Sequence, residues 1–143
     1  MEELQLVYEP FPSDTLMRFL SDNVVNVNFA RTGVATWHPV GFFLKNTRGE
    51  WLGGLTGYLW GGWMHVNFVW VTEALRGQRH GTRLMDAAES FAVERGCTGA
   101  TLETLSFQAP GFYAKRGYEV FGTLEDYPPG HSKFYLRKRL AHS

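Results

Sequence analysis

Four basic side chains gather in one short stretch near the middle of the chain: Arg76, Arg79, His80 and Arg83. They follow a run of β-branched and aromatic residues, 65–71, and precede a segment with helical periodicity, so they occupy a loop and the first turn of a helix. The nearest carboxylate inside that helix is Asp86. Because a helix N-terminus carries unsatisfied N–H groups and partial positive charge, it normally attracts acidic residues. We therefore expect an anionic ligand here, such as phosphate, with Gly77 and Gly81 allowing close approach of the backbone.

Charge alone also fits a basic surface that is merely solvated, but the spacing favours a ligand site. The run Arg76-Gly-Gln-Arg-His-Gly81 resembles the acetyl-CoA pyrophosphate loop of the GNAT superfamily of N-acetyltransferases. That pattern is Arg or Gln, two residues, Gly, one residue, then Gly or Ala. Arg79 stands in the middle glycine position, which leaves open whether it impairs or assists binding. The resemblance implies that acetyl-CoA contacts these residues of the loop: Arg76, Gly77, Gln78, Arg79, His80, Gly81 and Thr82.

A second motif later in the chain agrees with the first. The run from Ala109 to Tyr118, A-P-G-F-Y-A-K-R-G-Y, is similar to the GNAT signature of Ala, three residues, Tyr and then Glu-Lys-Leu-Gly-Phe. The preceding Leu102-Glu-Thr resembles the Leu-Glu-Val strand of the same superfamily. The matches together cover residues 64–118. They imply the GNAT fold, a mixed and mostly antiparallel α/β sheet with helices on both faces and a parallel, splayed strand pair at the cofactor groove.

The resemblance also implies the reaction, direct transfer of an acetyl group from acetyl-CoA to an amine. The departing thiolate needs a proton and the carbonyl oxygen gains charge in the transition state. Tyr113 matches the general acid of the superfamily, although a tyrosine packed on the core is the alternative. The backbone N–H of Val71 is expected at a strand bulge, donating to the acetyl oxygen. The remaining cofactor contacts are expected on the two splayed strands and the short helix, at Val69, Trp70, Val71, Ser106 and Tyr113.

The general base is left open among His65, Glu103 and ordered water. His65 lies where several GNAT members carry a glutamate that deprotonates the amine, and histidine can do this near neutral pH. A lone histidine in a strand is, however, commonly structural. Glu103 on the neighbouring strand serves equally well as the base or as a group that orients the acceptor.

Composition limits the other possibilities. A chain of 143 residues predicts one domain, residues 1–143. Lys+Arg 14 balances Asp+Glu 14, which gives no bulk charge for nucleic acid or a membrane surface. A single cysteine, Cys97, excludes an internal disulfide, the histidines lack metal-ligand spacing, and no signal or membrane span is recognised. We therefore expect a cytoplasmic enzyme with no metal, acting on a small-molecule amine, and a homodimer is left open.

Hydrophobic patterning places these motifs on regular elements. Strands are predicted over residues 4–8, 40–45, 51–60, 63–71, 99–107, 118–124 and 132–140. Helices are predicted over 14–20, over the central segment that ends at Arg95-Gly96, and over 108–117, whereas 22–39 is expected to be a short helix and a long loop. Because a helix connects strands 63–71 and 99–107, these two strands should be parallel.

A second class of function fits the same motifs, namely a GNAT-like module that binds an acyl-CoA or a small ligand without turnover. Arg79 favours this alternative, because a side chain in a glycine position can distort the loop. Tyr113 favours the enzyme, because a binding module does not require a placed phenol.

Overall fold

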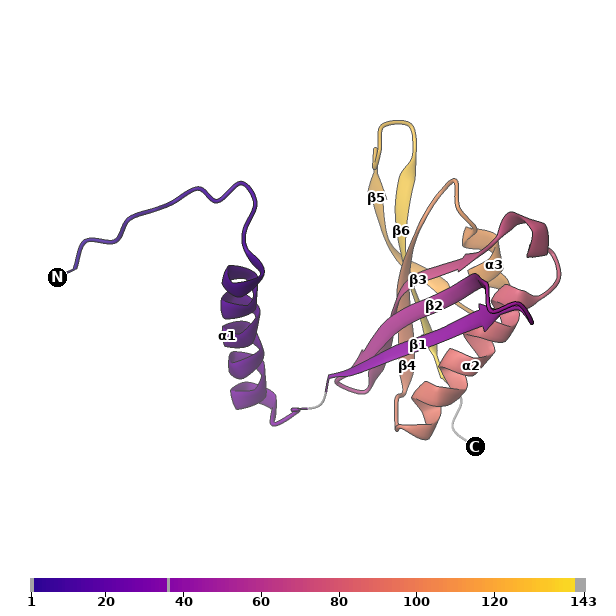
Figure 1. Cartoon of the computed structure of the whole chain (residues 1–143), viewed down its shortest axis with the longest axis horizontal. Coiled ribbons are helices and arrows are strands. Elements are labelled where there is room, and N and C mark those ends of the chain that lie inside the picture. The colour runs from indigo at the N-terminus through magenta and orange to yellow at the C-terminus, as the bar shows by residue number, and fades with distance from the viewer. Residues whose placement is uncertain (1, 36, 141–143) are drawn as a thin grey trace. The chain divides into compact units, whose positions relative to one another are not determined.

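The computed structural model describes residues 2–35 and 37–140, and the chain falls into two compact units, residues 1–35 and 36–143 (Figure 1). The first unit consists of an extended segment and helix α1 (Asp14–Thr32). The prediction of a strand at residues 4–8 is wrong, because this segment does not form a strand in the structure. Alternating side chains suit a strand, but a strand exists only where a neighbour accepts and donates its backbone hydrogen bonds.

Helix α1 is much longer than predicted, and the long loop expected over residues 22–39 is also wrong. Ser13 caps the helix by accepting a hydrogen bond from the N–H of Leu16. The polar residues of the second half bond back along the helix instead of breaking it, as Asn23 does to the carbonyl of Phe19. The helix stops only at Gly33, whose φ of 72° is the left-handed conformation that glycine adopts readily.

The second unit is a six-stranded sheet in the order β1-β2-β3-β4-β6-β5. The strands are β1 (His38–Lys45), β2 (Trp51–Trp60), β3 (Trp63–Val71), β4 (Gly99–Leu105), β5 (Glu119–Glu125) and β6 (Ser132–Arg139). The helical elements are η1 (Glu73–Leu75), α2 (His80–Glu94) and α3 (Pro110–Lys115). All neighbouring strands are antiparallel except β3 and β4, which are parallel. The predicted mixed, mostly antiparallel sheet with one parallel pair is confirmed.

Helix α2 buries its apolar stripe against strands β1, β2 and β3. Leu84, Met85, Ala88 and Ala92 are all buried, and their spacing follows the helical period. The strands contribute inward-facing residues such as Leu55, Met64 and Leu102 to the same core. This packing fixes the N-terminus of α2 at the end of strand β3.

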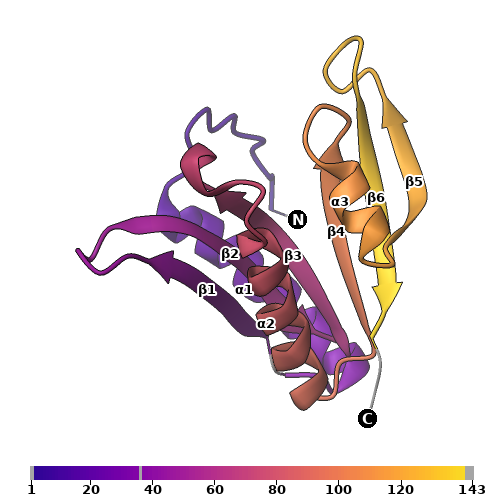
Figure 2. The same ribbon diagram turned by 90° about the vertical axis from the view of Figure 1, so that its right-hand side faces the viewer.

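Strands β3 and β4 separate soon after they pair (Figure 2). Their parallel register runs only from Trp63 and Gly99 to Val66 and Leu102. The β2–β3 register shifts at the same place, because Gly57 pairs with Val66 whereas Thr56 pairs with Phe68, which leaves Asn67 as an extra residue. The bulge expected near Val71 therefore lies at Asn67. A bulge bends its strand, and here it coincides with the point where β3 leaves β4.

Gly57 makes room for this bulge. A Cβ built on Gly57 would overlap the carbonyl oxygen of His65, and it would lie 3.1 Å from Cα of Val66. We expect Gly57→Ala to lower the free energy of unfolding by about 1 to 3 kcal/mol, the usual cost of overpacking. The measurement is urea unfolding. Gly122→Ala is the matched control, because its Cβ would make an ordinary 3.5 Å contact with Tyr135 and should change stability by less than about 0.5 kcal/mol. Equal midpoints for the two variants would contradict the prediction.

Candidate active site

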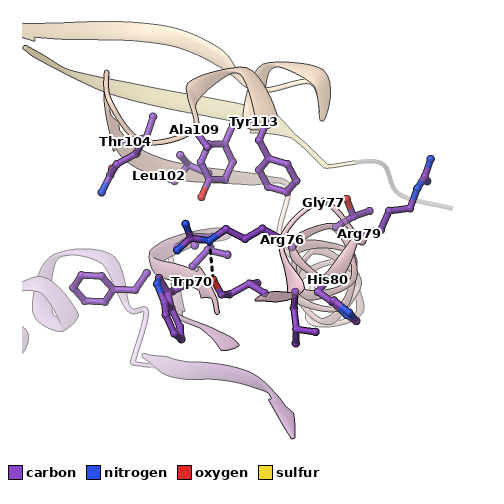
Figure 3. Close-up of a pocket in the computed structure, with 18 of the residues that line it drawn as sticks. Trp70, Arg76, Gly77, Arg79, His80, Leu102, Thr104, Ala109 and Tyr113 are labelled. Atoms are coloured by element: carbon purple, nitrogen blue, oxygen red, sulfur yellow. Dashed lines mark hydrogen bonds between the residues drawn. The ribbon is translucent and has the colours of Figure 1, made fainter. Parts of the chain in front are cut away.

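A pocket of about 770 Å³ opens where strands β3 and β4 part (Figure 3). Three segments line it: the end of β3 with the following loop and the start of α2, the middle of β4, and the turn that leads into α3. The lining includes residues from both faces of the sheet, for example Leu102 from the buried face and Glu103 from the opposite one. The pocket therefore lies in the gap in the sheet and is in contact with groups on either side of it.

The backbone of β3 presents polar groups to this gap. The N–H of Thr72 donates to the carbonyl of Leu52. At this end of β3, the backbone N–H and C=O groups of Thr72 and of Trp70, two residues earlier, therefore point toward β2. Because N–H and C=O groups point to alternate sides along a strand, those of Val69 and Val71 face the side where β4 has moved away. Such an edge can hydrogen-bond an extended ligand as an added strand would.

The loop after β3 has the conformation that an anion site needs. Gly77 has a φ of 79° and Arg79 a φ of 66°, and both lie in the left-handed region. Arg79 is the N-cap of α2 and its side chain makes no capping hydrogen bond, so the first N–H groups of the helix remain available. Arg76 folds back across the pocket, where its Nε donates to the carbonyl of Val71 at 3.1 Å and ties the loop to the strand (Figure 3).

The start of α2 is basic, as the sequence predicted. Its first turn contains no acidic residue. Arg83 donates to Nδ1 of His80 at 3.3 Å, which requires an imidazole lone pair at that nitrogen. The helix dipole and the arginines therefore add positive potential in the same place, which fits a pyrophosphate.

Tyr113 extends from α3 into the pocket, with its hydroxyl pointing toward the side of Arg76 and strand β3 (Figure 3). Its ring packs between Phe112, at 5.1 Å between centroids, and Tyr118, at 6.0 Å. Burial raises the pKa of the Tyr113 phenol above its ordinary value. The hydroxyl is therefore protonated near neutral pH, which is the state that a general acid requires.

The two candidate bases lie on the sheet face opposite α2. Glu103 lines the pocket and pairs with Lys133, whose Nζ lies 2.9 Å from its Oε2. The His65 ring packs in a tilted arrangement against the ring of Tyr58, with 5.4 Å between the centroids, and His65 does not line the pocket. Burial lowers the pKa of His65 below its ordinary value, and the negative charge of Glu103 opposes this shift. His65 is therefore neutral at physiological pH.

The structure brings most of the predicted site residues together around one pocket. The predicted residues that line it are Val69, Trp70, Val71, Arg76, Gly77, Arg79, His80, Gly81, Thr82, Glu103 and Tyr113. Three predicted residues lie outside the lining. The amide of Gln78 bonds back to the carbonyl of Ala74, the hydroxyl of Ser106 accepts from the N–H of Ser132, and His65 lies on the outer face.

Sequence reasoning missed several residues on the β4 side of the pocket. Gln108 accepts hydrogen bonds from the hydroxyl of Thr104 and the N–H of Leu105, and thereby closes the turn between β4 and α3. Phe107 adds aromatic surface on this side, and Phe68, also missed, adds it from β3. Ala109 also lines the pocket. It is the first residue of the second motif, and this position could have identified it as a pocket residue from the sequence. The partnership between Gln108 and Thr104 had no signal in the sequence pattern.

Residues 2–35 and 37–140 contain neither a metal-ligand cluster nor a helix suited to span a membrane. No group of three or more His, Cys, Asp or Glu side chains in this part of the chain could hold a metal ion. No helix there is both long enough and apolar enough to cross a membrane. Cys97 is buried, and burial raises the pKa of its thiol, so it is a poor nucleophile.

Comparison with known proteins agrees with this geometry. Residues 4–118 match the acetyltransferase (GNAT) family. The chain is 46% identical over 94 residues to a blasticidin-S acetyltransferase of Streptomyces morookaense, which covers 65% of this chain and 69% of that protein. It is 33% identical over 121 residues to an acetyltransferase of Agrobacterium fabrum, covering 85% and 88%. A crystal structure of an acetyltransferase from Bacillus cereus superposes with a TM-score of 0.83 at 32% identity, over 95% of this chain and 98% of that one.

The family match and the relatives named as acetyltransferases identify the protein as an acyltransferase, and the split sheet with a basic helix start fits that class. Within that class, the chain belongs to the acetyltransferase (GNAT) family.

Arg79 provides a direct test of the phosphate loop. A left-handed conformation costs a non-glycine residue about 1 to 2 kcal/mol, so Arg79→Gly should relieve this strain and raise the free energy of unfolding. The side chain is exposed and extends outward from the loop (Figure 3). A long arginine side chain at this position has the reach to turn toward a phosphate bound at the helix start. We therefore expect Arg79→Gly also to flatten the salt dependence of acetyl-CoA binding, measured by calorimetry at several salt concentrations.

Arg48→Gly is the matched control, because Arg48 is an exposed arginine in the β1–β2 turn that does not line the pocket. It should leave the salt slope unchanged. An unchanged slope in Arg79→Gly as well would show that the Arg79 guanidinium does not contact phosphate.

Proposed function

We propose that this acetyltransferase transfers the acetyl group of acetyl-CoA directly to a primary amine of a small molecule within a ternary complex. The observation that carries this proposal is the shared pocket: the backbone N–H groups of Val69 and Val71, the basic loop and the Tyr113 hydroxyl all meet there. The pyrophosphate would lie on the N–H groups at the start of α2, and the pantetheine arm along the edge of β3. The acetyl carbonyl would accept a hydrogen bond from the backbone N–H of Val71.

The acceptor amine would approach from the sheet face that carries Glu103. A carboxylate attracts the ammonium form of the acceptor, and Lys133 is the counter-ion that the acceptor would displace. The amine must lose a proton before it attacks the carbonyl carbon. The neutral imidazole of His65 would take this proton through water, since it lies behind the pocket wall. The amine would then form the C–N bond, and Tyr113 would protonate the thiolate of CoA as the C–S bond breaks. The second proton of the acceptor nitrogen, released as the amide forms, would return the Tyr113 phenolate to the phenol.

The relative named for blasticidin S suggests which acceptors to try first. We propose a small, polar, cationic amine of the antibiotic type, with blasticidin S as the first candidate. The negative charge of Glu103 on the acceptor side supports a cationic acceptor. We further propose that residues 1–143 act as one domain, because a single family match starts at residue 4, in the first unit, and continues to residue 118.

The competing function is a module that binds acyl-CoA without turnover. The one observation in its favour is the left-handed Arg79 in the phosphate loop. The inward-pointing Tyr113 hydroxyl favours the enzyme.

The deciding experiment is a thiol-release assay with acetyl-CoA and a panel of amines: blasticidin S, a streptothricin, aminoglycosides, polyamines and peptides. We expect steady, acceptor-dependent release with at least one small cationic amine. Tyr113→Phe should keep the dissociation constant for acetyl-CoA within a few-fold and lower turnover by roughly 100-fold or more, the scale of general acid catalysis. Tyr127→Phe is the matched control, because Tyr127 does not line the pocket. Acetyl-CoA binding without release for any amine would favour the binding module.

The pH profile separates the two candidate bases. If His65 accepts the proton, kcat/KM for the acceptor should fall on the acid side as His65 protonates, with a limb below about 6.5 because burial lowers its pKa. Glu103→Gln removes the negative charge that opposes this shift, so the limb should move to still lower pH. His65→Gln should abolish it. Acceptors of different basicity serve as the control, because a limb that belongs to the substrate moves with them. Loss of the limb in Glu103→Gln and its persistence in His65→Gln would identify Glu103 as the base.

A further inference from the structure

Glu89 on α2 is a largely buried carboxylate that the proposed reaction does not use. Its side chain is 12% exposed and receives donors from three other parts of the chain. Arg116 donates at 3.1 Å, the hydroxyl of Tyr118 at 3.0 Å and the ammonium of Lys138 at 2.6 Å. Arg116 is the C-cap of α3, Tyr118 directly precedes β5, and Lys138 lies in β6. One carboxylate therefore ties α2 to the β4 side of the pocket.

The side chains that bond to Glu89 are largely buried and have few other hydrogen-bond partners. Arg116 is only 13% exposed, and its second bond goes to Asp86 at 2.9 Å. Its Nε is buried and has no hydrogen-bond partner among the described residues. Tyr118 is 4% exposed, and its hydroxyl bonds to Glu89. A charge in such surroundings is stable only while its partners stay in place, so the cluster holds α3 in one position.

This cluster leads directly to Tyr113. The Tyr118 ring packs edge to face on the Tyr113 ring, with 6.0 Å between the centroids. The backbone N–H groups of Arg116 and Tyr118 both donate to the carbonyl of Tyr113, at 3.0 and 3.1 Å. Two residues that bind Glu89 therefore also fix the backbone and the ring of Tyr113. The GNAT signature has Phe where this chain has Tyr118, so the hydroxyl that reaches Glu89 is a departure of this chain from the motif.

We propose that Glu89 is a positioning residue that, through Arg116 and Tyr118, holds the Tyr113 phenol at the site of the departing thiolate. This inference rests on the proposed role of Tyr113 as the general acid. A cluster that only stabilised the fold would change stability and leave the chemical step alone. A positioning cluster changes kcat through Tyr113 and leaves binding of acetyl-CoA alone.

The test is a double-mutant cycle on the full chain, with acetyl-CoA and the best acceptor of the panel. Glu89→Gln should lower kcat by roughly 10- to 100-fold, the effect of a small misplacement of a catalytic group. The dissociation constant for acetyl-CoA and the KM for the acceptor should stay within about threefold, since neither site contains Glu89. In the Tyr113→Phe background, Glu89→Gln should lower the remaining rate less than about twofold, because its route of action is already removed.

Two further variants complete the design. Tyr118→Phe removes one hydroxyl, keeps the ring and installs the residue of the family motif, so it tests the proposal even if Glu89→Gln does not fold. It should lower kcat about 3- to 10-fold, the scale of one hydrogen bond. Glu119→Gln is the matched control, because Glu119 bonds Arg137 on the exposed surface of β5 and β6, with side chains 70% and 52% exposed. It should leave kcat unchanged.

The results separate the failure of this proposal from the failure of the proposed function. Suppose that Tyr113→Phe is slow. If Glu89→Gln or Tyr118→Phe then lowers kcat by the same factor in the wild-type and Tyr113→Phe backgrounds, or does not lower it at all, the positioning role is wrong. If Tyr113→Phe turns over like the wild type, Tyr113 is not the acid, and a role for Glu89 in positioning that acid is overturned with it. The expected loss of kcat in the wild-type background alone, with unchanged binding, supports the proposal.

Discussion

Strands β3 and β4 share four residue pairs and then part, and the whole site depends on this separation. A backbone N–H that faces a gap needs a partner from outside the sheet. The extra residue at Asn67 gives β3 its bend, and the missing side chain of Gly57 gives the bend room. The site is therefore an interruption of the hydrogen-bonded sheet, and the ligand would take the place of the missing strand contacts.

The two sides of the gap are stabilised by different interactions. On one side, α2 buries its apolar stripe against β1 to β3, which is the main hydrophobic contribution. On the other, β4 is held by β6, and the short helix α3 has no buried residue of its own. A helix of six residues is unstable in isolation, so its position must come from contacts with the rest of the fold. The bonds that Glu89 receives from Arg116 and Lys138 supply such contacts across the two sides.

Charge is distributed so that the two substrates would meet opposite potentials. The chain has no net charge, yet the start of α2 is basic and the opposite face of the sheet carries Glu103 at the pocket. In the proposed reaction, acetylation converts a cationic amine into a neutral amide. The attraction to Glu103 is then lost, and Lys133, which already pairs with that carboxylate, can return to it. The same carboxylate would thereby favour binding of the acceptor and release of the product.

The sequence by itself determined the features that depend on neighbours along the chain. Runs of apolar, β-branched and aromatic residues and the Gly61-Gly62 turn located β2 and β3, and the basic, glycine-containing run located the loop before α2. The crossover through α2 determined the parallel pairing, because a helix that connects two strands permits little else. The motif around Tyr113 identified the residue that enters the pocket. These features follow from local hydrogen bonding and from the side-chain period, which the order of residues encodes directly.

Only the tertiary structure decided which distant residues meet. It showed that residues 4–8 form no strand and that α1 continues to its C-cap at Gly33, and it located the bulge at Asn67. It also separated His65 from the pocket wall, and it joined Glu89 to donors from α3 and β6. A lone carboxylate within a helical pattern predicts a solvated surface. Its burial depends on three donors that follow it by 27 to 49 positions, and no local pattern encodes that meeting.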